Sequence, residues 1–516
     1  MEYFEIDNET EKKEKNKSSK NYKNKNILYL FLVFSFLFIL FLNFKDSLLP
    51  EFHNLSKNNN EEENPKANDI YNIKSLELQP HLFTEYLMNL FVNYDKINLT
   101  IFENINMNII NQKIYSIISH ENENKDLYII LSTIYGAFLA DSMDSFCEFK
   151  SFNKNNHLNI FDKNKNYIFK PGQVTDDSEM AMSQAYAIMD NSDIYNLNQN
   201  LIFYYYLIWY KSHPLDIGVT TRNALSTVIL NEKNNIKSNI FTDEIKEQIK
   251  EKNYNSLANG LLMRISPILC WFYMINKDYI RKILETKNSE KYYELYIKIF
   301  NQIEKDAQLT HPNRENSVSG AVFIFMGICA MEQKYSGKEI VNMVSILFNN
   351  NHFDIIKEEK IVKNHFINII NDIKKKDFEE SKYFGNLSEL MGYYLHAYKL
   401  TLYYLYKFDD LKKNLNIKKI YSKIIFDICD FGGDTDTNAA IVGMIIGPLI
   451  GIKNFGDEYL NTFLKFYDKK RLIYTNSFIY FYAKYLVEIS SDNYKFGEKV
   501  NFNFYKMINE LISKKL

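Results

Sequence analysis

The stretch FGGDTDTNAA at positions 431–440 places two carboxylates and threonine hydroxyls between paired glycines and an apolar run typical of a helix. Far upstream, the stretch TDDSEM at 175–180 has the same make-up, with acids and hydroxyls just ahead of a helical pattern. Hard cations such as Mg²⁺ prefer oxygen ligands. If folding brings the two stretches face to face, they predict an all-oxygen site for one or two metal ions.

Each stretch also has an interpretation without a metal. Asp176 and Glu179 have the N-cap and N3 spacing of a helix start, where acidic side chains are stabilising. Capping needs only one acid, whereas the adjacent Asp177 adds a repulsion that a cation would relieve. Asp434 and Asp436 show the same surplus of charge. We therefore favour metal binding by the pair of stretches, with helix capping as the alternative.

Apolar residues recur at helical spacing from about Tyr71 onward, and no sustained alternation of apolar and polar residues occurs. This pattern predicts an all-α domain. Helices are expected over residues 128–140, 180–189, 202–210, 318–331, 387–406 and 439–450. Polar segments at 231–256, 276–298 and 349–385 are expected to be insertions between core helices. Gly443, Gly447 and Gly451, spaced four apart, predict a helix face for tight packing.

The composition excludes some classes of protein. The 516 residues carry a net charge of −2, and the lysines are spread among asparagines, so nothing suggests a nucleic-acid-binding surface. The hydrophobic content of 46% is enough for one large core. Four cysteines stand singly in mostly apolar neighbourhoods, which argues against zinc and predicts free buried thiols at Cys147, Cys270, Cys329 and Cys429.

The N-terminal region reads as a membrane anchor. Residues 1–26 form a polar, lysine-rich tail, and 27–44 form an apolar segment that approaches the length of a bilayer span. A cleaved signal peptide is the alternative, but the run has no small-x-small cleavage site. The lysines predict a cytosolic N-terminus. We expect residues 45–70 to be a disordered tether and 71–516 to form one monomeric domain.

Six elements of the sequence, in order, resemble the motifs of the ADP-ribosylglycohydrolases, the group that includes dinitrogenase-reductase activating glycohydrolase and the ADP-ribosylarginine and ADP-ribosylserine hydrolases. The match runs from about Leu127 to Ile450, with a motif core at 127–451. The elements are GAFLAD at 136–141 with Glu148 seven residues on, TDDSEM at 175–180, DIGVTTR at 216–222, NGLLMRISP at 259–267, THP at 310–312 and GGDTDT at 432–437.

The resemblance implies a compact, mostly orthogonal bundle of α-helices with two Mg²⁺ ions at the mouth of a cleft. The implied metal ligands are Thr175, Asp176, Asp177, Asp434, Asp436 and Thr437. The implied substrate is an ADP-ribosyl group on a protein side chain or a small molecule, released as ADP-ribose by hydrolysis. The residues agree with this chemistry, since paired metals can bind ribose hydroxyls and lower the pKa of a water molecule.

By the same resemblance, Glu148 and Asp216 are the candidate acid/base residues, and Asn259, Gly260 and His311 the candidate substrate-binding residues. Taken alone, Glu148 could be a surface residue and Asp216 a helix cap. A lone histidine before a proline, or an Asn-Gly pair, is also more often structural.

Two positions depart from the family pattern, because Ala140 and Asp144 stand where the family has glycine. They keep open an alternative function, a non-catalytic ADP-ribose binder or structural, crystallin-like protein on the same scaffold. A hydrolase acting on another glycosidic or phosphate substrate is a third possibility.

Overall fold

The computed structural model describes residues 107–162, 168–228, 240–385 and 387–491, and these contain α-helices, short 3-10 helices and no named strand. The first half comprises α4 (Met107–Ser119), α5 (Lys125–Asp144), η2 (Asn156–Asn159), α6 (Asp176–Asp190), α7 (Gln199–Lys211), α8 (Val219–Leu225), α9 (Asp243–Asn253), η3 (Asn259–Arg264), α10 (Ser266–Ile275), α11 (Lys277–Thr286) and α12 (Ser289–Ala307). The second half comprises α13 (Arg314–Met331), α14 (Gly337–Phe348), η4 (Asn351–Asp354), α15 (Lys357–Ile373), α16 (Glu380–Phe384), α17 (Tyr394–Asn414), α18 (Ile417–Phe431), α19 (Thr435–Ile450), η5 (Ile452–Asn454), α20 (Asp457–Lys465), η6 (Lys469–Tyr474), η7 (Asn476–Phe478) and α21 (Ile479–Ile489). The predicted all-α class is confirmed.

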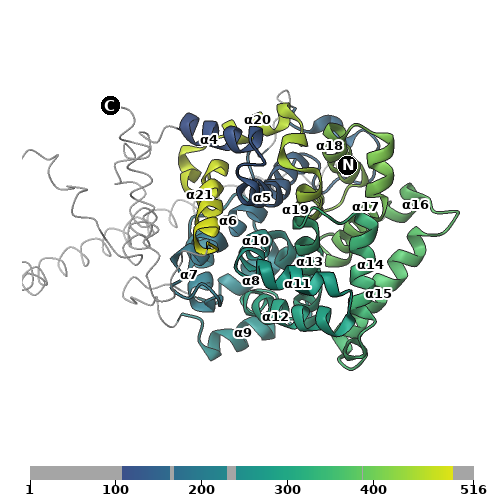
Figure 1. The fold of residues 1–516 in the computed structure, drawn as a ribbon. Helices are drawn as coiled ribbons and strands as arrows, with labels where there is room; N and C mark the ends of the chain where they lie inside the picture. The colour runs from purple at the N-terminus through teal and green to yellow at the C-terminus, as the bar shows by residue number, and fades with distance from the viewer. Residues whose placement is uncertain (1–106, 163–167, 229–239, 386, 492–516) are drawn as a thin grey trace, which may run out of the picture. The chain divides into compact units, whose positions relative to one another are not determined.

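Helices α5 and α19 lie side by side and form the central pair of the bundle (Figure 1). Almost every residue of both helices is buried, so neither has a solvent face. Their backbones touch through glycines. A Cβ at Gly443 would lie 2.0 Å from the carbonyl oxygen of Gly136, and one at Gly447 would lie 2.3 Å from that of Ser132. Such approaches are possible only without a side chain, which confirms the packing role expected for Gly443 and Gly447.

The remaining helices cover this pair. Helices α13, α17 and α18 pack on α19, whereas α10 and α21 pack on α5 and α6. This arrangement matters for function because α5 and α19 each carry one of the quoted motifs at an end. Close packing of the two helices fixes those ends relative to each other.

Most expected helices are present, and the exceptions have clear causes. The runs 128–140, 180–189, 202–210, 318–331 and 439–450 lie inside α5, α6, α7, α13 and α19. The helix expected over 387–406 was wrong in its first part, because residues before Tyr394 form turns around Leu390, which has φ 50°.

The expectation of polar insertions was also wrong in part. Segment 276–298 contains α11 and the start of α12, whose apolar side chains enter the core, and 349–385 contains α15. These helices are amphipathic, with a polar outer face that hides their buried stripe in a composition-based reading.

The cysteines differ from the expectation of four free thiols. Cys147 and Cys429 form a disulfide that spans 282 residues of sequence, whereas Cys270 and Cys329 are free and buried as expected. The bond joins the loop after α5 to α18. Sequence spacing did not indicate it, because partners this remote are paired only by the tertiary fold.

The predicted tail, anchor and tether at 1–26, 27–44 and 45–70 lie outside the described residues. Within the part of the chain that the structure describes, no helix is long and apolar enough to cross a bilayer.

Candidate metal centre and substrate cleft

The upstream corner, residues 175–180, begins helix α6, and a third carboxylate performs the capping there. Asp141 of α5 accepts hydrogen bonds from the backbone N–H of Thr175 (3.1 Å), from that of Ser178 (3.3 Å) and from the Ser178 hydroxyl. The helix start is thereby satisfied by a residue of another helix. Asp176 and Asp177 are therefore free for another task, and the capping interpretation of this stretch does not hold.

Glu179 of the same corner points away from the other acids. Its carboxylate pairs with the Arg471 guanidinium and accepts a hydrogen bond from Trp209 Nε1 at 2.9 Å. Burial raises the Glu179 pKa, while the charge of Arg471 opposes that shift. Glu179 thus ties α6 to the C-terminal part of the bundle and is no part of the acidic cluster.

The downstream corner, residues 432–437, depends on two glycines. Gly432 and Gly433 have φ 77° and 85°, values that favour glycine. They let the chain leave α18, pair with Lys150 in an isolated antiparallel bridge and enter α19 at once. A Cβ at Gly432 would lie 2.2 Å from the Lys150 carbonyl oxygen. The loop that carries Glu148 is therefore pressed against the loop that carries Asp434.

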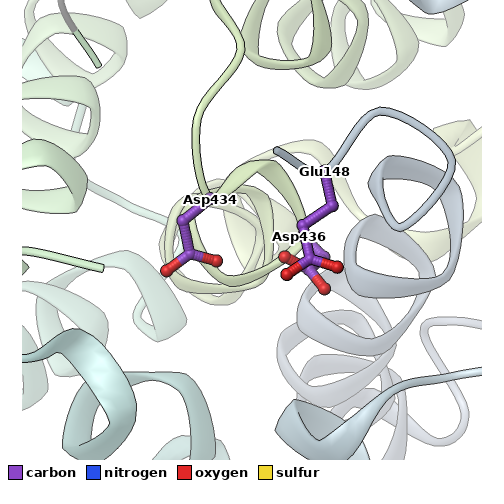
Figure 2. Close-up of side chains that lie close together, drawn as sticks. All are labelled: Glu148, Asp434 and Asp436. Carbon is purple, nitrogen blue, oxygen red and sulfur yellow. The ribbon is translucent and has the colours of Figure 1, made fainter. Parts of the chain in front are cut away.

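The two corners meet. Asp177 Oδ2 accepts hydrogen bonds from the hydroxyls of Thr175 (3.1 Å) and Thr437 (3.3 Å), one from each corner. Glu148, Asp434 and Asp436 each place one carboxylate oxygen so that the three lie within 4.8 Å of one another. Figure 2 shows Asp434, the N-cap residue of α19, and Asp436 in its first turn, with Glu148 reaching toward the Asp436 carboxylate from a neighbouring segment.

This acidic cluster is mostly buried, with Glu148 and Asp434 half-buried, and its carboxylates repel one another. Burial, reinforced by the neighbouring acids, raises the pKa of Asp176, Asp177 and Asp436 well above the usual value. Burial and the charges of Asp434, Asp216, Asp176 and Asp141 raise the pKa of Glu148 to about 9.

One buried oxygen of the cluster, Asp177 Oδ1, has no hydrogen-bond partner among the described residues. Unpartnered carboxylates that crowd a buried space cost stability unless a proton or a cation compensates them. The donor set of carboxylate and hydroxyl oxygens fits a hard divalent cation.

Asp216 lies near the upstream corner but does not cap α8. Its Oδ1 accepts from the backbone N–H of Ile217 (2.7 Å), and the helix starts at Val219 after Gly218. The Gly218 N–H donates to Asp176 Oδ2 at 3.3 Å. Asp216 is thus held beside the cluster, where its charge contributes to the raised pKa of both Asp176 and Glu148.

The three predicted substrate-binding residues also lie together. Asn259 Nδ2 donates to Asp434 Oδ2 at 2.8 Å, so Asn259 joins η3 to the cluster. A Cβ at Gly260 would lie 2.8 Å from both Cε1 and Nε2 of His311. Burial, assisted by the positive charge of Arg264, holds the His311 pKa well below its usual value, so this imidazole is neutral.

Asp141 and Arg264 belong to the motifs quoted above, but the sequence did not indicate which groups they orient. Asp141 caps α6, as described above. Arg264, fully buried, donates to the Gly260 carbonyl oxygen (3.2 Å) and to Thr310 Oγ1 (2.7 Å), next to His311. Its charge is balanced by Asp306 at 3.0 Å. The charge of each residue was a signal, but only the fold shows what each one orients.

Gly392 was missed altogether. Its carbonyl oxygen accepts from the Asn259 N–H at 2.7 Å, and a Cβ there would lie 3.4 Å from Asp434 Oδ2. A single glycine in a polar loop offered no signal in the sequence.

Sequence comparisons with known proteins indicate one family. The family model described as ADP-ribosylglycohydrolase matches residues 124–480. A protein of Acanthamoeba polyphaga mimivirus, named provisionally as an ADP-ribosyl glycohydrolase, is 28% identical over 333 residues, which cover 62% of this chain and 86% of the viral protein. A solved structure described as an ADP-ribosylglycohydrolase-related protein complex aligns with a TM-score of 0.46 at 14% identity, covering 71% of this chain and all of that one. Since the family model spans well over half of the sequence and contains both acidic corners, the chain belongs to the ADP-ribosylglycohydrolase family.

Proposed function

We propose that the protein is a Mg²⁺-dependent hydrolase that cleaves the glycosidic bond of ADP-ribosylated side chains or related ADP-ribose conjugates and releases ADP-ribose. The observation that carries this proposal is the meeting of two remote acidic corners in one buried cluster. Thr175, Asp176, Asp177, Asp434, Asp436 and Thr437 would hold two Mg²⁺ ions. Bound there, the ions would supply Lewis acidity toward ribose hydroxyls and water.

The remaining residues suit the proton transfers of the reaction. Hydrolysis breaks the bond between the anomeric carbon and the acceptor atom, adds hydroxide to that carbon and gives one proton to the acceptor. Glu148, half-buried beside Asp434 and Asp436, is placed to give that proton to the acceptor. Asp216, beside the cluster and half-buried, is placed to take a proton from the attacking water.

Substrate binding is assigned to Asn259, Gly260 and His311. Asn259 is bonded to Asp434, so a group that contacts its amide is held next to the acids. Gly260 has no side chain, which lets the His311 ring lie against its backbone. These residues would orient the ribose and phosphates.

The test is a turnover assay on the full chain. Mono-ADP-ribosylated arginine and serine peptides and O-acetyl-ADP-ribose are incubated with Mg²⁺, and released ADP-ribose is followed by mass spectrometry. Turnover that EDTA abolishes and Mg²⁺ restores is expected. If calorimetry shows ADP-ribose binding but no conjugate is hydrolysed, the protein is a non-catalytic binder and the proposal fails.

We also propose that residues 27–44 anchor the protein in a membrane as a single span, with the catalytic domain in an oxidising compartment. The Cys147–Cys429 disulfide supports that side of the membrane, since such bonds are rare where thiols are kept reduced. Protease protection of reporters fused to each end would test the orientation, and a catalytic domain on the cytosolic side would contradict it.

A further inference from the structure

Exposed apolar side chains occur next to several residues of the acidic site along the chain, and we call them the apolar rim. It consists of three segments of the chain. Their exposed members are Phe149 (66% exposed), Leu215 (56%), Val219 (71%), Leu390 (77%) and Met391 (48%). Single exposed apolar residues are ordinary, but several beside one functional site indicate an interaction surface.

Each segment of the rim is attached to the site by a backbone contact. Phe149 follows Glu148, and its N–H donates to the Gly433 carbonyl oxygen at 2.8 Å. Leu215 and Val219 flank the loop whose Gly218 N–H binds Asp176. Leu390 and Met391 precede Gly392, which lies against Asp434 and Asn259. The three segments of the rim are therefore attached at different residues of the site.

Two members of the rim are held in a costly backbone conformation. Phe149 has φ 60° and Leu390 has φ 50°, in the left-handed region that large side chains avoid. Such strain costs about 1 kcal/mol or more per residue and gathers at functional sites. Core packing does not account for these side chains, because both are mostly exposed. Asparagine would fit the same backbone better and would be more soluble.

We propose that the apolar rim binds the polypeptide that carries the ADP-ribose. The preferred substrate is then an ADP-ribosylated protein segment with apolar residues beside the modified side chain, rather than a small conjugate. This inference rests on the proposed function. The polar sugar and phosphates suit the cluster and its amide and backbone donors, so the apolar surface at the edge faces the only remaining part of the substrate, the acceptor.

Charge distinguishes a polypeptide from a membrane as the occupant. The three segments, 148–149, 214–219 and 389–392, carry the acids Glu148, Asp216 and Glu389 and contain no lysine or arginine. Lys150 follows the first segment, and its Nζ donates to the Phe146 carbonyl oxygen at 2.6 Å. Membrane-binding surfaces combine apolar with basic residues, since cellular lipid surfaces are negative. An acidic and apolar edge instead complements a peptide that carries apolar and basic side chains.

The experiment compares substrates and variants in the full chain. Phe149→Asn and Leu390→Asn remove the apolar side chains and suit the left-handed backbone, so neither variant should lower the unfolding temperature. Ile355→Asn is the matched control, because Ile355 is 73% exposed at the end of η4. The substrates are a peptide with leucines flanking the modified residue, the same peptide with serines there, and the modified amino acid alone.

The expected result is a loss of at least about tenfold in kcat/KM for the leucine-flanked peptide in both rim variants, and none in Ile355→Asn. Activity on the modified amino acid should change by less than about twofold. Equal losses on all substrates, or equal wild-type rates on both peptides, would overturn the inference while leaving the proposed function intact.

Two further outcomes are separable. If wild-type protein hydrolyses no conjugate, the proposed function fails and the inference with it. If the rim variants keep full peptide activity but bind vesicles of phosphatidylcholine and phosphatidylserine less well than Ile355→Asn does, the rim is a membrane contact and the polypeptide assignment is wrong.

Discussion

Removal of the Cys147–Cys429 disulfide should destabilise the fold and loosen the metal site. The bond closes a loop of 282 residues, and in the chain-entropy description a loop of this size corresponds to about 5.6 kcal/mol at 25 °C. Measured losses on removing native disulfides are roughly 2–5 kcal/mol. We therefore expect Cys147→Ala with Cys429→Ala to lower the free energy of unfolding by about 4 kcal/mol.

Loss of the disulfide should also weaken Mg²⁺ binding at the acidic cluster. Cys147 directly precedes Glu148, and Cys429 lies in the last turn of α18, just before Gly432. The disulfide thus fixes the spacing of the two loops that bring Glu148 and Asp434 together. Without it, the Mg²⁺ concentration for half-maximal stabilisation should rise about tenfold, equivalent to roughly 1.4 kcal/mol of binding free energy.

Urea unfolding followed by tryptophan fluorescence measures the first effect, because Trp209 and Trp271, the two tryptophans of the chain, are buried. The matched control is Cys270→Ala with Cys329→Ala, which removes two buried thiols without removing a cross-link. If the two double variants unfold within about 1 kcal/mol of each other, the disulfide does not have the role argued here. An unchanged Mg²⁺ requirement would refute its effect on the site.

Three other predictions concern the acidic cluster and the residues beside it. Asp177→Asn replaces a crowded buried carboxyl by a neutral amide, so thermal unfolding without metal at pH 8.5 should show a stability gain of about 1–3 kcal/mol, while Mg²⁺-dependent turnover falls at least about 100-fold. Without metal, the raised pKa values mean that the native state binds more protons than the unfolded state. The folded state is therefore most stable below pH 4.5, the unfolded pKa of Glu148, and loses this stability as the pH rises to about 9. Urea unfolding midpoints measured in EDTA should accordingly be lower at pH 8.5 than at pH 5.5. A midpoint that rises with pH would contradict this. Gly260→Ala should displace His311 and raise KM at least about tenfold for a stability loss of about 1–3 kcal/mol; an unchanged KM would remove these residues from the binding site.

The helices that could be predicted from the sequence are those buried on all sides. Helices α5, α13 and α19 have continuous apolar runs in the sequence. They could be recognised without the spacing of their apolar residues and without knowing which helices pack on them. Helix α11 was missed because only one stripe, including Ile280, Ile283 and Leu284, is buried and the rest is polar. The composition of such a helix averages its polar and apolar faces, whereas the three- to four-residue spacing of its apolar side chains reveals the buried face.

The acidic corners were recognisable because they hold more carboxylates than local structure needs. Asp176 and Asp177 together exceed the requirement of a helix start, and the fold supplies Asp141 for that task. What could not be predicted is which distant group satisfies which local need. The Arg471–Glu179 pair, the contact of Gly392 with Asn259 and the disulfide all depend on the packing of segments that lie far apart in sequence.

The departure at Asp144 shows how the fold can neutralise a residue that looks disruptive in the sequence. Helix α5 remains regular through Asp144, so this position needs no glycine. Its carboxyl is fully buried, and neither oxygen has a hydrogen-bond partner within the described ranges. Burial, with the charges of Asp430 and Asp141, raises the Asp144 pKa well above its usual value, which favours the neutral form of the carboxyl. A neutral carboxyl adds no charge to the cluster. The departure therefore gives no support to a non-catalytic binder over a hydrolase, because the acids that would hold the metals keep their arrangement.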